Sequence, residues 1–304
     1  MNKRFLLVLL IILPFVSFSQ YLWDIGGSIG ASSFLGDVGG KNTPAKKFIG
    51  DLNMPSTRPG LGLYARYKIS PLFSVRAMFS YSSIAGDDKL STYLPRKGRN
   101  LSFRNNIYEL SVSGEVYFYE IPGLVQNFKT NVDFKSYVSI GVSGFHHNPQ
   151  AQYQGQWVDL APLHTEGVNY SLWQVAVPIG LGANFTVNRK HRIGLEVIWR
   201  KTFTDYLDDV STRYVDPSTL SSPTAVALAN RSGEIQTTDP DLKTLLSYNY
   251  QPHGLRGDPK NNDTWFTYQL TYSYVIRGKS SFYRSRYPTL FGKKNRKRKI
   301  RAKF

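Results

Sequence analysis

The segment WFTYQLTYSYVI, residues 265–276, decides the fold class of this chain. Its large apolar and aromatic side chains occupy every second position, at Phe266, Tyr268, Leu270, Tyr272, Tyr274 and Ile276. Small polar side chains stand between them, at Thr267, Gln269, Thr271 and Ser273. Successive side chains of a β-strand point to opposite faces, so this alternation predicts a strand with one apolar face and one polar face.

Seven further segments show the same alternation. They are WDIGGSIGASSFL (23–35), GLGLYARYKI (60–69), FSVRAMFSYS (73–82), IYELSVSGEVYF (107–118), SYVSIGVSGF (136–145), LWQVAVPIGLGANFTV (172–187) and RIGLEVIWRKTF (192–203). An aromatic content of 14% agrees with β structure, because aromatic residues are enriched in strands. The sequence therefore predicts an all-β protein with eight strands.

Two all-β folds fit this pattern. In a soluble sandwich or a lipocalin-like barrel the apolar face points inward, whereas in a transmembrane barrel it meets lipid and the lumen is polar. The membrane fold is favoured because the segments are ten or more residues long and the polar face carries charges. Aromatic residues also gather near both strand ends, as expected where amphipathic rings meet lipid headgroups. One set is Trp23, Tyr67, Phe73, Phe118 and Tyr274, and the other is Tyr81, Tyr108, Trp173, Trp199 and Phe266. We therefore predict an eight-stranded antiparallel transmembrane β-barrel.

The connections differ in length on the two sides of this predicted barrel. Short turns stand at 70–72 and 188–191, with a somewhat longer link at 120–135. The other connections are long, at 37–58, 86–101, 146–169 and 204–263. Short periplasmic turns and long extracellular loops are typical of outer-membrane barrels. We therefore expect an outer-membrane location with both termini in the periplasm.

The two ends of the chain divide it into three parts. Residues 1–20, MNKRFLLVLLIILPFVSFSQ, have the order of a cleaved signal peptide: Lys3 and Arg4, an apolar run, then small residues. The barrel is expected over 21–276. A basic periplasmic tail is expected over 277–304, which hold twelve Lys or Arg and no acid out of a net charge of +17. Because the protein is expected to be exported, we expect no nucleic-acid partner for this tail. The absence of cysteine excludes thiol catalysis and cysteine metal sites.

Charged side chains on the polar strand faces predict a filled lumen. An eight-stranded barrel is just wide enough for its side chains to fill it. Charges there should pair across the barrel, because an isolated charge in a low-dielectric interior is costly. The predicted network comprises Glu109, Glu115, Glu196, Arg66, Lys68, Arg76 and Arg200. We read it as structural and expect no aqueous pore.

No arrangement of residues predicts a catalytic or metal site. His146 and His147 are adjacent, so in an extended chain they point to opposite faces. Oxygen-rich loops can bind calcium, but the EF-hand spacing is missing from 204–216, so its acids are expected to order the rim by hydrogen bonds. These acids are Asp205, Asp208, Asp209 and Asp216. Calcium binding there stays an open alternative, and we expect a non-enzymatic protein with no cofactor.

Several segments resemble the PorG family, outer-membrane barrels of the type IX secretion system. They are LSFRNNIYEL (101–110), FHHNPQAQYQGQWVDLAPLHTEG (145–167), TFTDYLDDVSTRY (202–214) and LRGDPKNNDTWF (255–266). The most specific match is the pattern NPxAxxxGxWxxLxPLxTEG, carried by Asn148, Pro149, Ala151, Gly155, Trp157, Leu160, Pro162, Leu163, Thr165, Glu166 and Gly167. The resemblance implies a non-enzymatic component of protein secretion, and of gliding motility in some cells. It implies an anchor for the periplasmic ring proteins of the PorK/PorN or GldK/GldN type, and not the translocation pore.

This resemblance suggests a role for the tail. Twelve cations without acids cannot form a folded core, but they can bind an acidic surface. The expected partner-binding residues are Phe282, Tyr283, Arg284, Arg286, Tyr287, Phe291, Lys293, Lys294, Arg296, Lys297, Arg298, Lys299 and Arg301, where aromatic residues would supply interface anchors. The tail could instead contact anionic lipid headgroups or the cell wall. Two other functions stay open: a barrel that binds or admits a hydrophobic ligand, and a surface adhesin acting through 204–263.

Overall fold

A computed structural model describes residues 22–39, 54–127 and 130–277 of the chain. The expected signal peptide (1–20) and the partner-binding residues of the tail (282–301) lie outside these residues. Eight strands form the barrel: β1 (Leu22–Leu35), β2 (Arg58–Lys68), β3 (Phe73–Asp87), β4 (Ser102–Gln126), β5 (Asn131–His146), β8 (Trp173–Val187), β9 (His191–Thr202) and β10 (Thr264–Arg277).

The barrel closes on itself through antiparallel pairing. The strands follow the order β3-β2-β1-β10-β9-β8-β5-β4, and β3 pairs with β4 to complete the circle. Strand β10, which holds the segment quoted first, pairs with β1 along its whole length, from Leu22↔Arg277 to Leu35↔Thr264. The prediction of an eight-stranded antiparallel barrel is therefore confirmed.

The barrel is apolar outside and charged inside. On the outer face Leu63, Val142 and Leu195 are 67–69% exposed. On the inner face Glu115 is fully buried and Arg66 is 2% exposed. This is the arrangement of a transmembrane barrel, and it excludes the soluble alternative, in which the apolar face would be inside. In the described part of the chain, no helix combines the length and the apolar character needed to cross a membrane.

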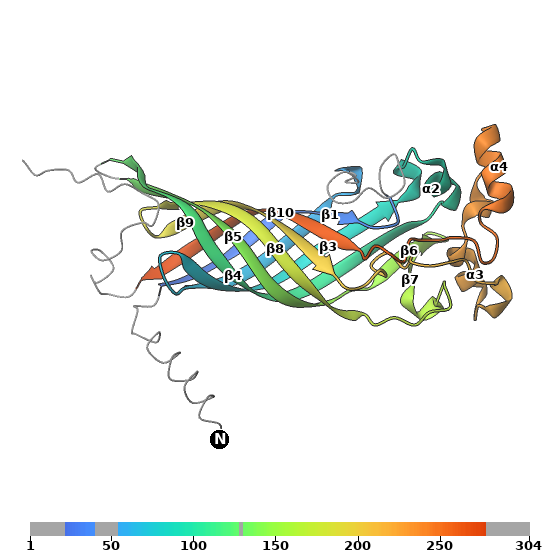
Figure 1. Cartoon of the computed structure of the whole chain (residues 1–304), viewed down its shortest axis with the longest axis horizontal. Helices are drawn as coiled ribbons and strands as arrows, with labels where there is room; N and C mark the ends of the chain where they lie inside the picture. Colours follow the sequence, from blue (N-terminus) through green and yellow to red (C-terminus); the bar gives the residue numbers. More distant parts are fainter. Residues whose placement is uncertain (1–21, 40–53, 128–129, 278–304) are drawn as a thin grey trace, which may run out of the picture.

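The long connections fold into a cap at one end of the barrel. Figure 1 shows the cap at the right, opposite the end where β1 begins and β10 ends. A hairpin of β6 (Pro149–Tyr153) and β7 (Gln156–Asp159) continues the edge of β4 through the pairs Arg104↔Gln150 and Asn105↔Pro149. The cap helices are η3 (Met54–Ser56), η4 (Asp88–Leu90), α2 (Leu94–Arg99), η5 (Ala161–Leu163), η6 (Pro217–Thr219), α3 (Pro223–Ala229), η7 (Ser232–Glu234) and α4 (Pro240–Tyr248).

Two details differ from the sequence predictions. The link expected over 120–135 is mostly strand, because β4 and β5 keep pairing past two register shifts, at Tyr117/Tyr119 and Ile121/Val125. Phe266, expected to face lipid, is only 4% exposed. Its ring stacks against those of Trp199 and Tyr268, with the centroids 6.4 Å apart in each pair.

Candidate functional site

The lumen holds the predicted ion-pair network. Arg76 donates two hydrogen bonds of 2.7 Å to the two carboxylate oxygens of Glu196. Arg66 Nε lies 2.6 Å from Glu115 Oε2, and Arg200 Nε donates to Glu109 Oε2 at 2.7 Å. Paired, bidentate contacts of this kind compensate the desolvation of buried charges. The six predicted Glu and Arg residues therefore pair across the barrel as expected.

The network extends further than predicted. Asp24 accepts a hydrogen bond from Arg66 at 3.3 Å and forms an ion pair with Arg192. Asp24 and Arg192 stand at inward-facing positions of β1 and β9, so strict alternation would have identified them. Lys68, in contrast, stands at the last position of β2 and is only half-buried, so it is not enclosed like the other six.

An apolar layer separates the charged lumen from the cap. It joins inward-facing side chains of six strands to residues of the loops above them. The layer comprises Phe34, Val38, Ile84, Leu101, Phe103, Ile107, Phe145, Ala176, Leu207, Val210 and Trp265. The rings of Phe145 and Trp265 meet edge to face, with centroids 5.1 Å apart. The capped end of the barrel is therefore packed like a protein core.

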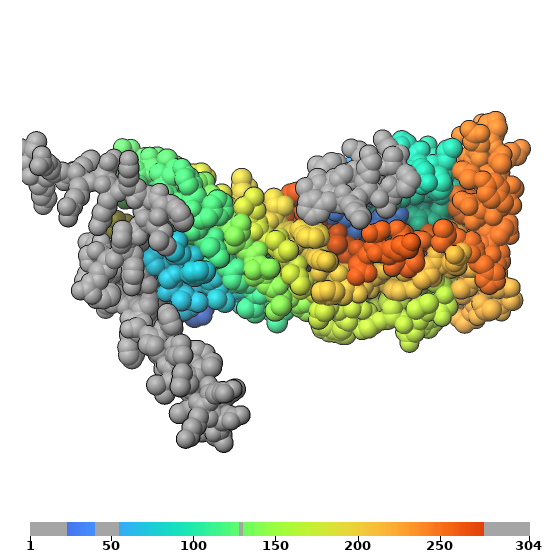
Figure 2. Space-filling model, viewed as in Figure 1, coloured from blue at the N-terminus to red at the C-terminus, as the bar shows by residue number. Residues whose placement is uncertain are grey.

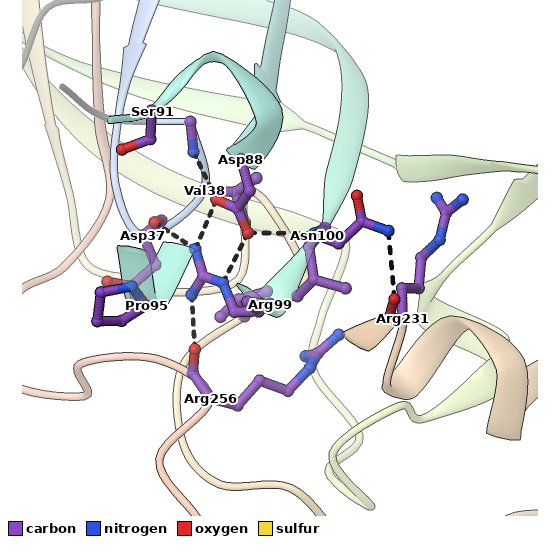
Figure 3. Close-up of polar contacts among 12 residues, drawn as sticks. Asp37, Val38, Asp88, Ser91, Pro95, Arg99, Asn100, Arg231 and Arg256 are labelled. Atoms are coloured by element: carbon purple, nitrogen blue, oxygen red, sulfur yellow. Dashed lines mark hydrogen bonds and ion pairs between the residues drawn. The ribbon is translucent and has the colours of Figure 1, made fainter. Parts of the chain in front are cut away.

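Two buried arginines tie the long loops together. Arg99, in the β3–β4 connection, donates to Asp88 at 2.8 and 3.0 Å. It also donates to the backbone oxygens of Asp37 and Arg256, each at 2.6 Å (Figure 3). Burial alone would lower the pKa of Arg99, but the Asp88 carboxylate holds that pKa above its usual value. This side chain therefore links three loops while fully charged.

Arg256 makes the second junction. It donates to Glu166 Oε1 at 2.9 Å, to the backbone oxygen of Asp209 at 2.6 Å and to that of Ala229 at 3.1 Å. Both arginines are missing from the sequence predictions, because irregular loops carry no periodicity that would mark a buried residue. The four long connections thus meet at two guanidinium groups.

The pattern NPxAxxxGxWxxLxPLxTEG builds the β6–β7 hairpin and fastens it to the cap. Gly155 turns the hairpin with φ +82°, a conformation that favours glycine. The guanidinium carbon of Arg104 lies over the Trp157 ring, 3.7 Å from the ring centroid. Glu166 accepts backbone N–H groups of Ser211 and Thr212 at 3.0 and 2.9 Å. These contacts give the pattern a structural role within this end of the molecule.

Three of the four predicted acids of the 204–216 loop accept hydrogen bonds, namely Asp208, Asp209 and Asp216, whereas both carboxylate oxygens of Asp205 are buried with no hydrogen-bond partner among the described residues. Asp208 accepts the backbone N–H groups of Val38 and Val210, at 2.9 and 3.0 Å. Asp209 accepts the hydroxyl groups of Thr165 and Tyr170, at 2.5 and 2.7 Å. Burial raises the pKa of Asp205 to about 9. Among the described residues, no three His, Asp or Glu side chains form a metal-ion cage.

His146 and His147 point apart, as expected for adjacent residues of a strand end. His146 packs against Trp173 on the outside, whereas His147 is fully buried beside Asn105 and Tyr170. Burial lowers the pKa of His147 to about 4, so this imidazole is neutral at pH 7.

An open groove of about 810 Å³ crosses the outer part of the cap. Two extended segments form it, joined by the bridge Arg213↔Leu255 and by hydrogen bonds from Tyr214 and His253. Figure 2 shows the outer cap as a broad end of the molecule, far from the short turns. The groove mixes cationic, acidic and apolar side chains and shows no preference for one class of ligand.

A family model described as a domain of unknown function (DUF6089) matches residues 3–221. This chain belongs to that family. No curated protein matches it. The family assignment thus brings no activity with it.

Solved structures show a distant similarity. Outer membrane protein OprG from Pseudomonas aeruginosa gives a TM-score of 0.39 at 10% identity, covering 85% of this chain and 97% of the other. Neisserial surface protein A (NspA) gives a TM-score of 0.38 at 7% identity, covering 84% of this chain and 97% of the other. Ail of Yersinia pestis, in complex with a heparin analogue, gives a TM-score of 0.36 at 10% identity, covering 84% of this chain and 99% of the other. Such values carry no functional argument, and closure of the barrel is established by its own strand pairing.

Proposed function

We propose that this protein is a non-enzymatic outer-membrane component of the type IX secretion machinery that anchors its periplasmic ring. The observation that carries the proposal is the filled barrel. Arg76 and Glu196 are bonded directly across the lumen, and the apolar layer lies above them. A barrel packed in this way offers a fixed platform in the membrane and no passage for a secreted protein.

The apolar outer face supports the outer-membrane location. Its strands carry exposed Leu, Ile and Val side chains from β1 around to β10. Aromatic pairs stand near the short-turn end, such as Trp23 with Tyr67 at 5.1 Å, and near the capped end, such as Tyr81 with Tyr108 at 5.3 Å. Rings at two levels suit the two headgroup layers of a bilayer. Short turns then belong in the periplasm and the cap outside the cell.

Tail composition supports the choice of partner. Residues 278–304 hold eleven Lys or Arg, no acid and several aromatic residues, and they follow directly from β10 at the short-turn end. With this orientation the tail enters the periplasm, where a ring lipoprotein and its partner would offer an acidic surface. The resemblance of 145–167 to the PorG family identifies the ring as the candidate.

Deleting 278–304 tests the proposal. We expect the barrel to remain inserted, with heat-modifiable mobility on a gel, while co-purification of the ring proteins and secretion of type IX substrates are lost. A matched control keeps the length of the tail and scrambles its order. Because charge attraction depends weakly on order, the scrambled tail should keep most of the binding and lose it as salt rises. Unchanged ring recovery and secretion after the deletion would contradict the proposed function.

A surface adhesin is the second candidate function, and the groove beside Leu255 favours it. Leu255 is 65% exposed within this outward-facing groove. An adhesin would lose its binding to host or cell surfaces after changes to 253–260 and keep secretion intact.

A further inference from the structure

The short-turn end of the barrel is uneven. β4 continues to Gln126, well past Val116, whose partner Phe73 is the first residue of β3. Over this continuation β4 pairs with β5, and its other edge has no partner strand in the described parts of the chain. Figure 1 shows this hairpin, drawn in green, projecting at the left. The barrel thus presents one protruding element on the side where both described ends of the chain lie.

Two exposed apolar side chains lie near the tip of this hairpin. Tyr119, Phe134 and Phe185 form a row of rings at its base, with centroids 6.2 and 5.0 Å apart. Beyond this row, Leu124 is 48% exposed and Val125 41%. Since aromatic rows lie at headgroup level, side chains beyond the row leave the hydrocarbon region. We therefore expect the exposed parts of these two apolar side chains to lie outside the hydrocarbon region.

Two cations lie beside the tip. Arg189 and Lys190 are exposed in the turn between β8 and β9. Two hydrogen bonds join this turn to the hairpin. The Asn188 N–H donates to Asn131 O at 2.7 Å, and Asn188 Oδ1 accepts the Asn131 N–H at 3.0 Å. The turn is also fixed to β10, because Val275 N–H donates to Lys190 O at 2.8 Å. Hydrogen bonds therefore join the hairpin, the turn that carries the two cations and the strand that leads into the tail.

Exposed charge at this end is positive. The acids in the described short-turn half are buried or half-buried: Asp24, Glu115, Glu120, Asp133 and Glu196. Glu120 pairs with Lys135 at 2.7 Å, and Asp133 accepts the Gly123 N–H at 2.8 Å. The tail that follows β10 adds eleven further cations and no acid.

We propose that Leu124, Val125, Arg189 and Lys190 form a rigid docking surface, next to the root of the tail, for a periplasmic protein that presents acidic side chains around an apolar patch. This inference rests on the proposed function and assigns a folded part of the barrel to the same contact. Charge complementarity selects an acidic partner. The apolar pair selects a protein over a lipid headgroup, because grouped apolar residues outside the membrane mark protein interfaces.

Three variants of the full-length protein, expressed in the native strain, test the surface. L124S/V125S removes the apolar half, R189S/K190S removes the charged half, and K243S/K260S is a control that removes two exposed lysines of the cap. Each is checked for heat-modifiable mobility, and the ring proteins that co-purify are quantified. We expect at least a tenfold loss of ring protein with each of the first two variants, and no change with the control.

The outcomes separate this inference from the proposed function. Wild-type ring recovery in L124S/V125S and R189S/K190S, with loss on deletion of 278–304, overturns the docking surface and leaves the function standing. If ring protein is lost with R189S/K190S and not with L124S/V125S, the contact depends on charge alone, as a contact with lipid headgroups would. That result overturns the composite surface. Wild-type recovery in all variants, the tail deletion included, overturns both.

Discussion

The two ends of the barrel use charge in opposite ways. At the capped end Arg99 and Arg256 are buried and fully bonded to acids and backbone oxygens from four loops. At the short-turn end Arg189 and Lys190 are exposed, and among the described residues no acid forms an ion pair with them. Buried and paired charges fix a structure, whereas exposed and unpaired ones are free to meet a partner. At the capped end buried charges hold the protein's own loops together, and at the short-turn end exposed cations offer the contact that we propose.

The lumen should show the largest effect of a single substitution. Glu109→Ala leaves the Arg200 guanidinium buried without its acid, which costs about 3–5 kcal/mol because the remaining charge is uncompensated. We expect reduced insertion and a lower temperature of gel-mobility change. A double change, E109L/R200M, removes both charges and should recover much of the loss. Equal damage from the single and double variants would contradict a paired network.

Arg256→Ala should damage the cap and spare the barrel. Removal of this side chain leaves Glu166 and Asp209 without their cation, again at a cost of about 3–5 kcal/mol. We expect proteolysis within 204–263 while the barrel keeps its heat-modifiable mobility. If Arg256→Ala instead reduced ring co-purification with an intact, protease-resistant cap, the division of roles between the two ends would be wrong.

Protonation of His147 should oppose folding of the capped end in acid, whereas Asp205, whose pKa is raised to about 9, acts in the opposite direction. The folded pKa of about 4 for His147 lies below the ordinary value of 6.5, so the unfolded loop binds a proton first. Stability from neutral His147 is complete above pH 6.5 and is lost as the pH falls toward 4, by about 2–3 kcal/mol. Limited proteolysis of the cap between pH 7 and 4 measures this. Relative to the parent protein, the His147→Gln variant should gain protection against protease as the pH falls through that window, and identical pH profiles of the two proteins would exclude His147 as a titrating group.

The smallest effect on stability is expected at the short-turn end. R189S/K190S should change the free energy of unfolding by less than about 0.5 kcal/mol, since exposed surface positions contribute little. Urea titration of the refolded barrel gives this value. A large destabilisation would mean that these two cations support the fold, and any loss of binding could not then be assigned to a lost contact.

How far the sequence predicts this molecule differs between the same two regions. In the strands, alternation places Glu109, Arg76 and Leu195 on the correct faces, because a strand has only two faces and a fixed period of two. It also predicts Phe266 to be exposed, which is wrong, because the period is local and does not report tertiary contacts such as the stacking of Phe266 against Trp199 and Tyr268.

Sequence alternation does not predict the cap contacts or the proposed docking surface, for a different reason. Arg99 and Arg256 meet across more than a hundred residues of sequence, and no local pattern reports that contact. Similarly, the β4–β5 hairpin that carries Leu124 and the turn that carries Arg189 are joined through the Asn131–Asn188 hydrogen bonds. Both features depend on which strands lie side by side in the closed barrel, which the sequence gives only once the topology is known.

Crosslinking from single cysteines at the two ends tests the central claim most directly. The natural chain has no cysteine, so one introduced at position 190 or at position 243 reports only its own surroundings. With a short thiol-to-amine crosslinker in living cells, the account predicts that Lys190→Cys captures the periplasmic ring lipoprotein and Lys243→Cys does not. Capture of the ring from Lys243→Cys, with none from Lys190→Cys, would contradict it.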